Sequence, residues 1–214
     1  MFTRADLKAK AKLDLKGNYG VAIGAYIVMF LILCVSGAVP FVGGIVPLVL
    51  TGVIGVGYAI IYLNISRGVK PDFAQLFDGF KNFGTTCIAG ILISIFTFLW
   101  SLLLFVPGII KGLSYSMTFY ILADHPEIRA TDAIKLSQQM MDGHKMDLFI
   151  LQISFIGWGI LCGLTLGILS LYVVPYIMAT TTNFYEAIKN EKNLFGINYS
   201  EAEIEETVDD IPQE

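Results

Sequence analysis

Four polar side chains share one face of an apolar segment near the middle of the chain. They stand at i, i+3, i+4 and i+7, a spacing that places them on one side of an α-helix: Lys111, Ser114, Tyr115 and Thr118. An ammonium group that faces a cavity in such a segment can bind an anionic group such as a phosphate or a carboxylate. Alternatively, Lys111 extends along its aliphatic stem to reach water and binds nothing. The sequence leaves both interpretations open.

A second polar stripe lies nearer the carboxyl end of the chain. Tyr176, Thr180 and Asn183 stand at i, i+4 and i+7 of another apolar segment. Two facing stripes could line a pore or a pocket for a headgroup, and together they form the predicted ligand-binding site. The same side chains could instead form hydrogen bonds between helices, worth about 0.6 kcal/mol each on average.

The remaining reactive side chains show no spacing that is typical of catalysis or metal binding. His125 and His144 have no ligand spacing to each other or to Cys34, Cys87 and Cys162, and the cysteines form no CxxC pair. No Walker loop, HExxH motif or nucleophile elbow occurs in the sequence. We therefore expect no catalytic residues, no metal and no cofactor, and we do not expect an enzyme.

The elements that carry these residues are long apolar runs. Hydrophobic residues make up 55% of the 214 residues, charged residues 15%, and the mean hydropathy is +0.68. A helix needs ~20 apolar residues to cross a ~30 Å hydrocarbon layer. The sequence predicts an all-α membrane protein with six such spans: Tyr19–Val39, Ile45–Ile65, Phe83–Phe105, Ile109–Ala123 (which is short), Leu148–Leu166 and Ile168–Ala187.

The spans belong to an internal repeat. Asp14, Asp78 and Asp142 are spaced 64 residues apart. The short sequences that begin at Asp78 and at Asp142 match, since both read Asp-Gly-x-Lys. A fixed period indicates one supersecondary unit that has been copied. We expect one membrane domain over residues 1–192, with helix-hairpin repeats at about 1–64, 65–128 and 129–192. Parallel repeats of this kind imply a pseudo-threefold arrangement.

Each repeat is predicted to open with a short amphipathic helix, which lies either in the membrane interface or under the bundle as its cytoplasmic floor. The apolar stripes of these helices contain Leu7, Ala11 and Leu15 in the first repeat, Phe73, Leu76, Phe77 and Phe80 in the second, and Ala133, Ile134, Ser137, Met140 and Met141 in the third.

Glycines at helical spacing suggest close contacts between the spans. Gly20 and Gly24 are four residues apart, as are Gly159, Gly163 and Gly167. Small residues on one helix face let two backbones approach each other. We therefore expect helix contacts at these glycines.

Charge placement predicts the orientation. Thirteen of the fourteen Lys and Arg residues lie before the first span, between successive repeats or after the last span. The short turns near Pro40, Pro107 and Gly167, which join the two spans of each repeat, are uncharged. An excess of cations marks the cytoplasmic side, so both termini are expected there. Residues 193–214 hold seven acids and no Lys or Arg, which predicts a disordered acidic tail that could dock a protein partner.

Several short sequence motifs resemble those of a known family. They include Pro107-Gly108-Ile109-Ile110-Lys111, Tyr120-Ile121-Leu122-Ala123-Asp124, Met141-Asp142-Gly143-His144-Lys145 and Phe155-Ile156-Gly157-Trp158. They are similar to a family of bacterial multi-pass membrane proteins catalogued as domain of unknown function 975. The resemblance is strongest over residues 105–187 and extends over 1–190. More distantly, the chain resembles the membrane domain attached to some glycerophosphodiester phosphodiesterases. The resemblance implies a location in a bacterial cytoplasmic membrane and favours the handling of lipids or headgroups, but it transfers no activity.

We expect a multi-pass membrane protein that binds or moves a lipid or another amphiphilic or anionic small molecule. Its partners would be membrane lipids and no nucleic acid. The alternative is a membrane scaffold or accessory subunit that does not transport anything and docks a partner through its amphipathic helices and acidic tail.

Overall fold

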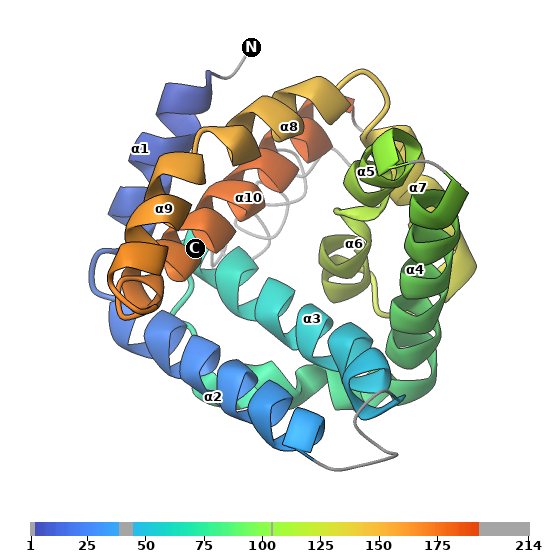
Figure 1. Cartoon of the computed structure of the whole chain (residues 1–214), viewed down its shortest axis with the longest axis horizontal. Helices are drawn as coiled ribbons and strands as arrows, with labels where there is room; N and C mark the ends of the chain where they lie inside the picture. Colours follow the sequence, from blue (N-terminus) through green and yellow to red (C-terminus); the bar gives the residue numbers. More distant parts are fainter. Residues whose placement is uncertain (1–2, 39–44, 104, 193–214) are drawn as a thin grey trace, which may run out of the picture.

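A computed structural model describes residues 3–38, 45–103 and 105–192 (Figure 1). These residues form α-helices and one 3-10 helix, η1, and contain no strand, which confirms the predicted all-α class. The acidic tail and the predicted turn near Pro40 lie outside the described residues. The helices are α1 (Arg4–Leu15), α2 (Tyr19–Ala38), α3 (Ile45–Ser66), η1 (Phe73–Asn82), α4 (Phe83–Leu103), α5 (Phe105–Tyr115), α6 (Thr118–Asp124), α7 (Ala130–Met140), α8 (Lys145–Ile153), α9 (Ile156–Leu164) and α10 (Ser170–Lys192).

Four of the predicted apolar runs form continuous helices, namely α2, α3, α4 and α10. The other two runs are not continuous helices. The run Ile109–Ala123 is divided between α5 and α6, and the run Leu148–Leu166 between α8 and α9.

A buried serine explains the break between α5 and α6. The Ser137 hydroxyl group of α7 donates a hydrogen bond to the Ser114 carbonyl oxygen at 2.8 Å and accepts one from the Met117 amide nitrogen at 3.2 Å. Ser137 is fully buried. Backbone groups freed by a broken helix need such partners in an apolar environment. The partner lies on a different helix, so the pattern of the run itself does not predict the break.

Glycines bring the backbone of α3 against η1. A Cβ atom added at Gly57 would lie 1.9 Å from the Leu76 carbonyl oxygen, and one at Gly79 would lie 1.9 Å from that of Val53. α3 crosses the interior of the molecule, with the other helices arranged around it (Figure 1). These contacts therefore fix η1 to a central element.

The glycines expected to mediate helix contacts behave differently. A Cβ atom at Gly20, Gly159, Gly163 or Gly167 would meet nothing within 4 Å. At Gly24 it would meet only the ring of Phe73, at 3.6 Å. The expectation of close backbone contacts at these positions was wrong for the chain as described.

Two of the short helices that open the repeats bury their apolar stripe against protein. α1 packs on α10 and buries Leu7, Ala11 and Leu15. α7 buries Ala133, Ile134, Ser137 and Met140. In η1 only Leu76 of the predicted stripe is buried, whereas Phe73, Phe77 and Phe80 are 38–45% exposed. η1 therefore presents an aromatic face outward.

Two helical stretches of the described chain are long and apolar enough to cross a membrane, Phe73–Leu102 and Lys145–Leu164. A third membrane-spanning stretch results if Arg4–Leu15 and Tyr19–Ile32, which meet at 96°, are counted as one span. Leu50–Ser66 is a shorter apolar helix. Large apolar side chains such as Phe98, Leu102 and Leu164 are 65–75% exposed on these stretches. Exposed apolar surface on helices of this length indicates association with a membrane.

Gly57→Ala is expected to destabilise the protein, because the new methyl group meets backbone atoms of η1 that cannot move independently. Forced overpacking costs about 1–3 kcal/mol. The matched control is Gly84→Ala in α4, where a Cβ atom meets nothing within 4 Å. Thermal unfolding in mild detergent should show a lower midpoint for Gly57→Ala only. Equal midpoints for the two variants would contradict the contact between α3 and η1.

Candidate functional site

Charged side chains meet where α3, α6 and α10 end or pass one another. Arg67 Nη2 lies 2.8 Å from Asp124 Oδ1 and 2.7 Å from Glu186 Oε1. Lys189 Nζ lies 2.8 Å from Asp124 Oδ2, and the Tyr185 hydroxyl group donates a hydrogen bond to the same oxygen at 2.8 Å. The side chains of Asp124 and Lys189 are only 5% and 7% exposed. We refer to these five residues as the charge network.

Both central groups of the charge network stay ionised at neutral pH. Burial raises the pKa of Asp124, but Arg67 and Lys189 outweigh it and hold this pKa below its usual value. Burial lowers the pKa of Arg67, but Asp124 and Glu186 outweigh that effect and raise it. A buried charge is tolerated when it is paired and hydrogen-bonded, and Asp124 meets both conditions.

A second polar contact ties α1 to the same region. The Asn183 side-chain amide donates to Asp14 Oδ2 at 2.8 Å, and the Ser66 hydroxyl group donates to Asn183 Oδ1 at 2.7 Å. Burial raises the pKa of Asp14, and the bond from Asn183 opposes that shift. Asn183, predicted as a ligand-binding residue, therefore joins α1, α3 and α10.

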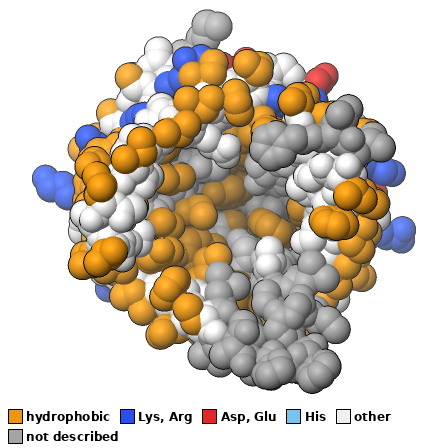
Figure 2. Space-filling model, viewed as in Figure 1, with side chains coloured by type: hydrophobic (Ala, Val, Ile, Leu, Met, Phe, Trp, Pro, Cys, Tyr) orange, Lys and Arg blue, Asp and Glu red, His pale blue; other side chains and the backbone are white. Residues whose placement is uncertain are grey.

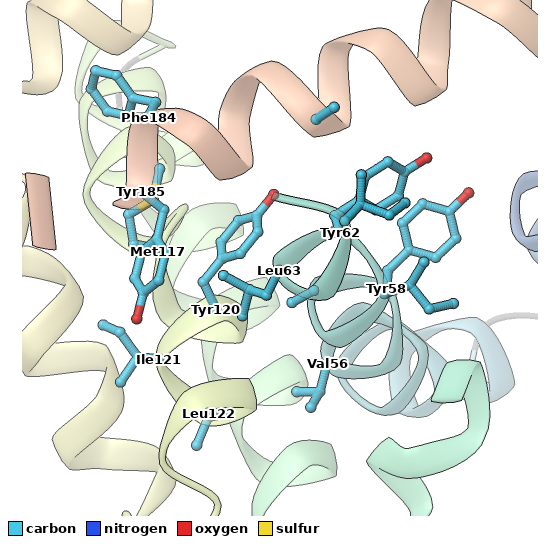
Figure 3. Close-up of a cluster of buried hydrophobic side chains, with 14 of the residues drawn as sticks. Val56, Tyr58, Tyr62, Leu63, Met117, Tyr120, Ile121, Leu122, Phe184 and Tyr185 are labelled. Carbon is cyan, nitrogen blue, oxygen red and sulfur yellow. The ribbon is translucent and has the colours of Figure 1, made fainter. Parts of the chain in front are cut away.

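Buried tyrosines of α3, α6 and α10 belong to one hydrophobic cluster, which includes Tyr185 of the charge network (Figure 3). The ring of Tyr120 on α6 stacks on that of Tyr185, with centroids 5.2 Å apart. Tyr58 and Tyr62 project from α3, and both hydroxyl groups are buried without a hydrogen-bond partner among the described residues. Buried hydroxyl groups of this kind normally bind water or a ligand.

The predicted stripe on α5 and α6 is largely buried. The Ser114 hydroxyl group donates to the carbonyl oxygen of Ile110 in its own helix, at 2.8 Å. Tyr115 is 5% exposed, and Thr118 is fully buried with no hydrogen-bond partner for its hydroxyl group among the described residues. Lys111 is half-buried, and its Nζ lies 5.2 Å from the centroid of the Trp100 ring. A cation over an aromatic face is stabilised there without any ligand.

The predicted stripe on α10 is buried as well. The Thr180 hydroxyl group donates to the Tyr176 carbonyl oxygen at 2.7 Å, and the Tyr176 ring meets that of Phe155 edge-on at 5.4 Å. α10 packs mainly on α1, α2 and α3, whereas α5 packs mainly on α4, α7 and α8. A cavity shared by the two stripes therefore stays a prediction.

An apolar pocket lies between α2, α9 and the beginning of α10. Its volume is about 730 Å³. One polar pair occurs in its wall, where the Tyr26 hydroxyl group donates to Ser170 Oγ at 3.1 Å. The face drawn in Figure 2 is hollowed in its middle, and hydrophobic side chains lie along the described part of the hollow. None of the seven predicted site residues lines the pocket, which is formed by Tyr26, Ile27, Phe30, Leu31, Cys162, Gly163, Leu166, Gly167, Ile168, Ser170 and Leu171.

The fold and the exposed apolar helices thus define an all-helical, membrane-associated protein. Residues 102–192 match the model of the family described as protein of unknown function (DUF975). This confirms the family resemblance seen in the sequence. No curated protein and no solved structure matches the chain.

Asp124→Asn is expected to lower stability at neutral pH, because it leaves Arg67 and Lys189 without their buried anion. Removing one partner of a buried ion pair costs about 3–5 kcal/mol. The control is Asp142→Asn, whose carboxylate is 82% exposed and lies 3.7 Å from Lys145. An exposed pair contributes about 0–1 kcal/mol. Thermal unfolding at pH 7 should separate the two variants.

The difference in stability between the wild type and Asp124→Asn is expected to depend on pH. The pKa of Asp124 is lower in the folded protein than in the unfolded chain, where a free Asp has about 3.9. The carboxylate therefore stabilises the fold above about pH 4, and this contribution is lost as the pH falls through the folded-state pKa. The wild type should approach Asp124→Asn in acid. A constant difference between the two proteins down to pH 3 would contradict this account.

Proposed function

We propose that the chain is a six-span protein of a bacterial cytoplasmic membrane, built from three helix-hairpin repeats with both termini in the cytoplasm. α2, α3, α4 and α10 each contain 20 residues or more, and α5–α6 and α8–α9 serve as interrupted spans. The 96° bend between α1 and α2 suits a helix that lies along the membrane surface before the chain enters it. The charge network then lies at the cytoplasmic ends of α3, α6 and α10.

Within this arrangement, we propose that the protein binds a lipid or a similar amphiphile. The observation that carries the proposal is the apolar pocket between α2, α9 and α10. Ligand pockets typically enclose about 300–1,000 Å³ and have apolar walls with a few polar groups, and this pocket of about 730 Å³ meets both criteria. An acyl chain matches its walls, and the Tyr26–Ser170 pair offers one hydrogen-bonding position.

The pocket wall continues into the outer surface of the protein. Ile27, Phe30 and Leu31 of α2 line the pocket and are 41–54% exposed. In the proposed orientation this surface faces the acyl chains of the bilayer. A lipid chain can therefore enter from the side without passing through water.

The second candidate function is a scaffold or accessory subunit that transports nothing. The buried polar stripes favour it, because the hydroxyl groups of Ser114 and Thr180 donate to their own helix backbones. Such bonds require no cavity. In that case the apolar pocket receives only unspecific lipid, and a partner docks elsewhere on the molecule.

Filling the pocket tests lipid binding. Gly163 lines the pocket, and a Cβ atom added there meets nothing within 4 Å, so Gly163→Phe projects a ring into the space without a backbone clash. Gly159→Phe is the matched control on α9, equally unobstructed but outside the pocket wall. Native mass spectrometry in mild detergent should show that Gly163→Phe binds lipid about tenfold more weakly than the wild type does, which corresponds to about 1.4 kcal/mol.

Equal lipid occupancy in both glycine variants would contradict the pocket and favour the scaffold. Lys111→Ala in the same experiment tests the site predicted from the sequence. If anionic lipid disappears in Lys111→Ala and persists in Gly163→Phe, the ligand binds at the α5–α6 stripe instead. Unchanged occupancy in Lys111→Ala leaves its contact with Trp100 as the role of this lysine.

A further inference from the structure

Two lysines of α1 lie over a pair of touching aromatic rings. Lys8 Nζ is 4.4 Å from the centroid of the Phe155 ring, and Lys12 Nζ is 5.6 Å from that of Tyr176. The two rings meet edge-on with centroids 5.4 Å apart. α1 therefore brings two ammonium groups to the place where the junction of α8 and α9 meets α10. We refer to these four residues as the basic–aromatic cluster.

Neither lysine forms an ion pair within the part of the chain that the structure describes. The nearby acids have other partners: Asp147 lies 3.6 Å from Arg4, and Asp14 accepts a hydrogen bond from Asn183. Partial burial lowers the pKa of Lys8, and the charge of Lys12 adds to that shift. The cluster therefore concentrates positive charge that forms no ion pair with a carboxylate of the described residues.

The basic–aromatic cluster and the apolar pocket lie on the same helices. Tyr176 stands five positions after Leu171 of the pocket wall on α10, which is about 7.5 Å at 1.5 Å per residue. On α9 the distance from Phe155 to Cys162 is about 10 Å by the same rise. Between them the rings of Tyr19 and Tyr172 stack, with centroids 5.4 Å apart. The acyl chains of one leaflet span about 15 Å, half of the ~30 Å hydrocarbon layer, so one lipid can reach both places.

We propose that Lys8 and Lys12 bind the phosphodiester headgroup of an anionic phospholipid whose acyl chain occupies the apolar pocket. The proposal rests on the proposed function and specifies its ligand. The ammonium groups supply the charge, and the rings of Phe155 and Tyr176 hold them in place. An uncharged or zwitterionic headgroup gains less from this arrangement, since each basic residue attracts the net negative charge of an anionic lipid.

The test uses the full-length protein, delipidated in mild detergent and titrated with dioleoyl phosphatidylglycerol or dioleoyl phosphatidylcholine, which share acyl chains and differ in net charge. Native mass spectrometry should show an about tenfold preference of the wild type for phosphatidylglycerol. Lys8→Gln with Lys12→Gln should abolish that preference, because phosphatidylglycerol then binds no more tightly than phosphatidylcholine. The matched control is Lys10→Gln with Lys16→Gln, which removes the same charge from exposed positions of the same segment and should keep the preference.

The outcomes separate this proposal from the one beneath it. Equal binding of the two lipids to the wild type, or equal loss in both double variants, would overturn the headgroup site while the Gly163→Phe result still stands. No binding of either lipid would overturn the pocket itself. Glycerol phosphate carries the phosphate without acyl chains. We expect it to leave bound phosphatidylglycerol in place, and its displacing the lipid would assign the cluster to a soluble phosphate ester.

Discussion

The pairing of one buried carboxylate holds this structure together. Asp124 ends α6 at a position that is almost inaccessible to water, where an unpaired anion would be too costly to keep. Arg67 from the end of α3 and Lys189 from α10 supply the compensating charge. Three helices that are far apart in the sequence must therefore meet at one point. Asn183 extends the same region to α1 through Asp14.

α10 connects this constraint to the proposed ligand site. Its final turns carry Tyr185, Glu186 and Lys189 of the charge network, and its first residues line the apolar pocket. Tyr176 of the basic–aromatic cluster lies between them. A helix anchored at one end by buried ion pairs presents the rest of its length at a fixed depth. The position of the pocket wall relative to α1 and α2 thus depends on the charge network, although the two share no residue.

The sequence predicts the parts of this structure that depend on local patterns. The apolar runs of α2, α3, α4 and α10 are long, and their length alone identifies them. The break after Tyr115 depends on Ser137, whose hydroxyl group comes from another helix. The partners of Asp124 lie 57 and 65 residues away, and no spacing marks them. Polar side chains within apolar runs mark the predicted stripes in the sequence. The apolar residues that line a pocket look the same in the sequence as the rest of an apolar run. Only the assembled helices show that Gly57 touches a backbone.

The proposed six-span orientation requires that α1 and the connection from α9 to α10 lie on opposite sides of the membrane. Labelling of single cysteines in intact cells tests this directly, with Cys34, Cys87 and Cys162 replaced and one cysteine introduced at Lys16 or at Leu166, which is 93% exposed. A membrane-impermeant maleimide should label the cysteine at 166 in intact cells and the cysteine at 16 only after permeabilisation. Labelling of both positions, or of neither, before permeabilisation would place them on one side and contradict the account.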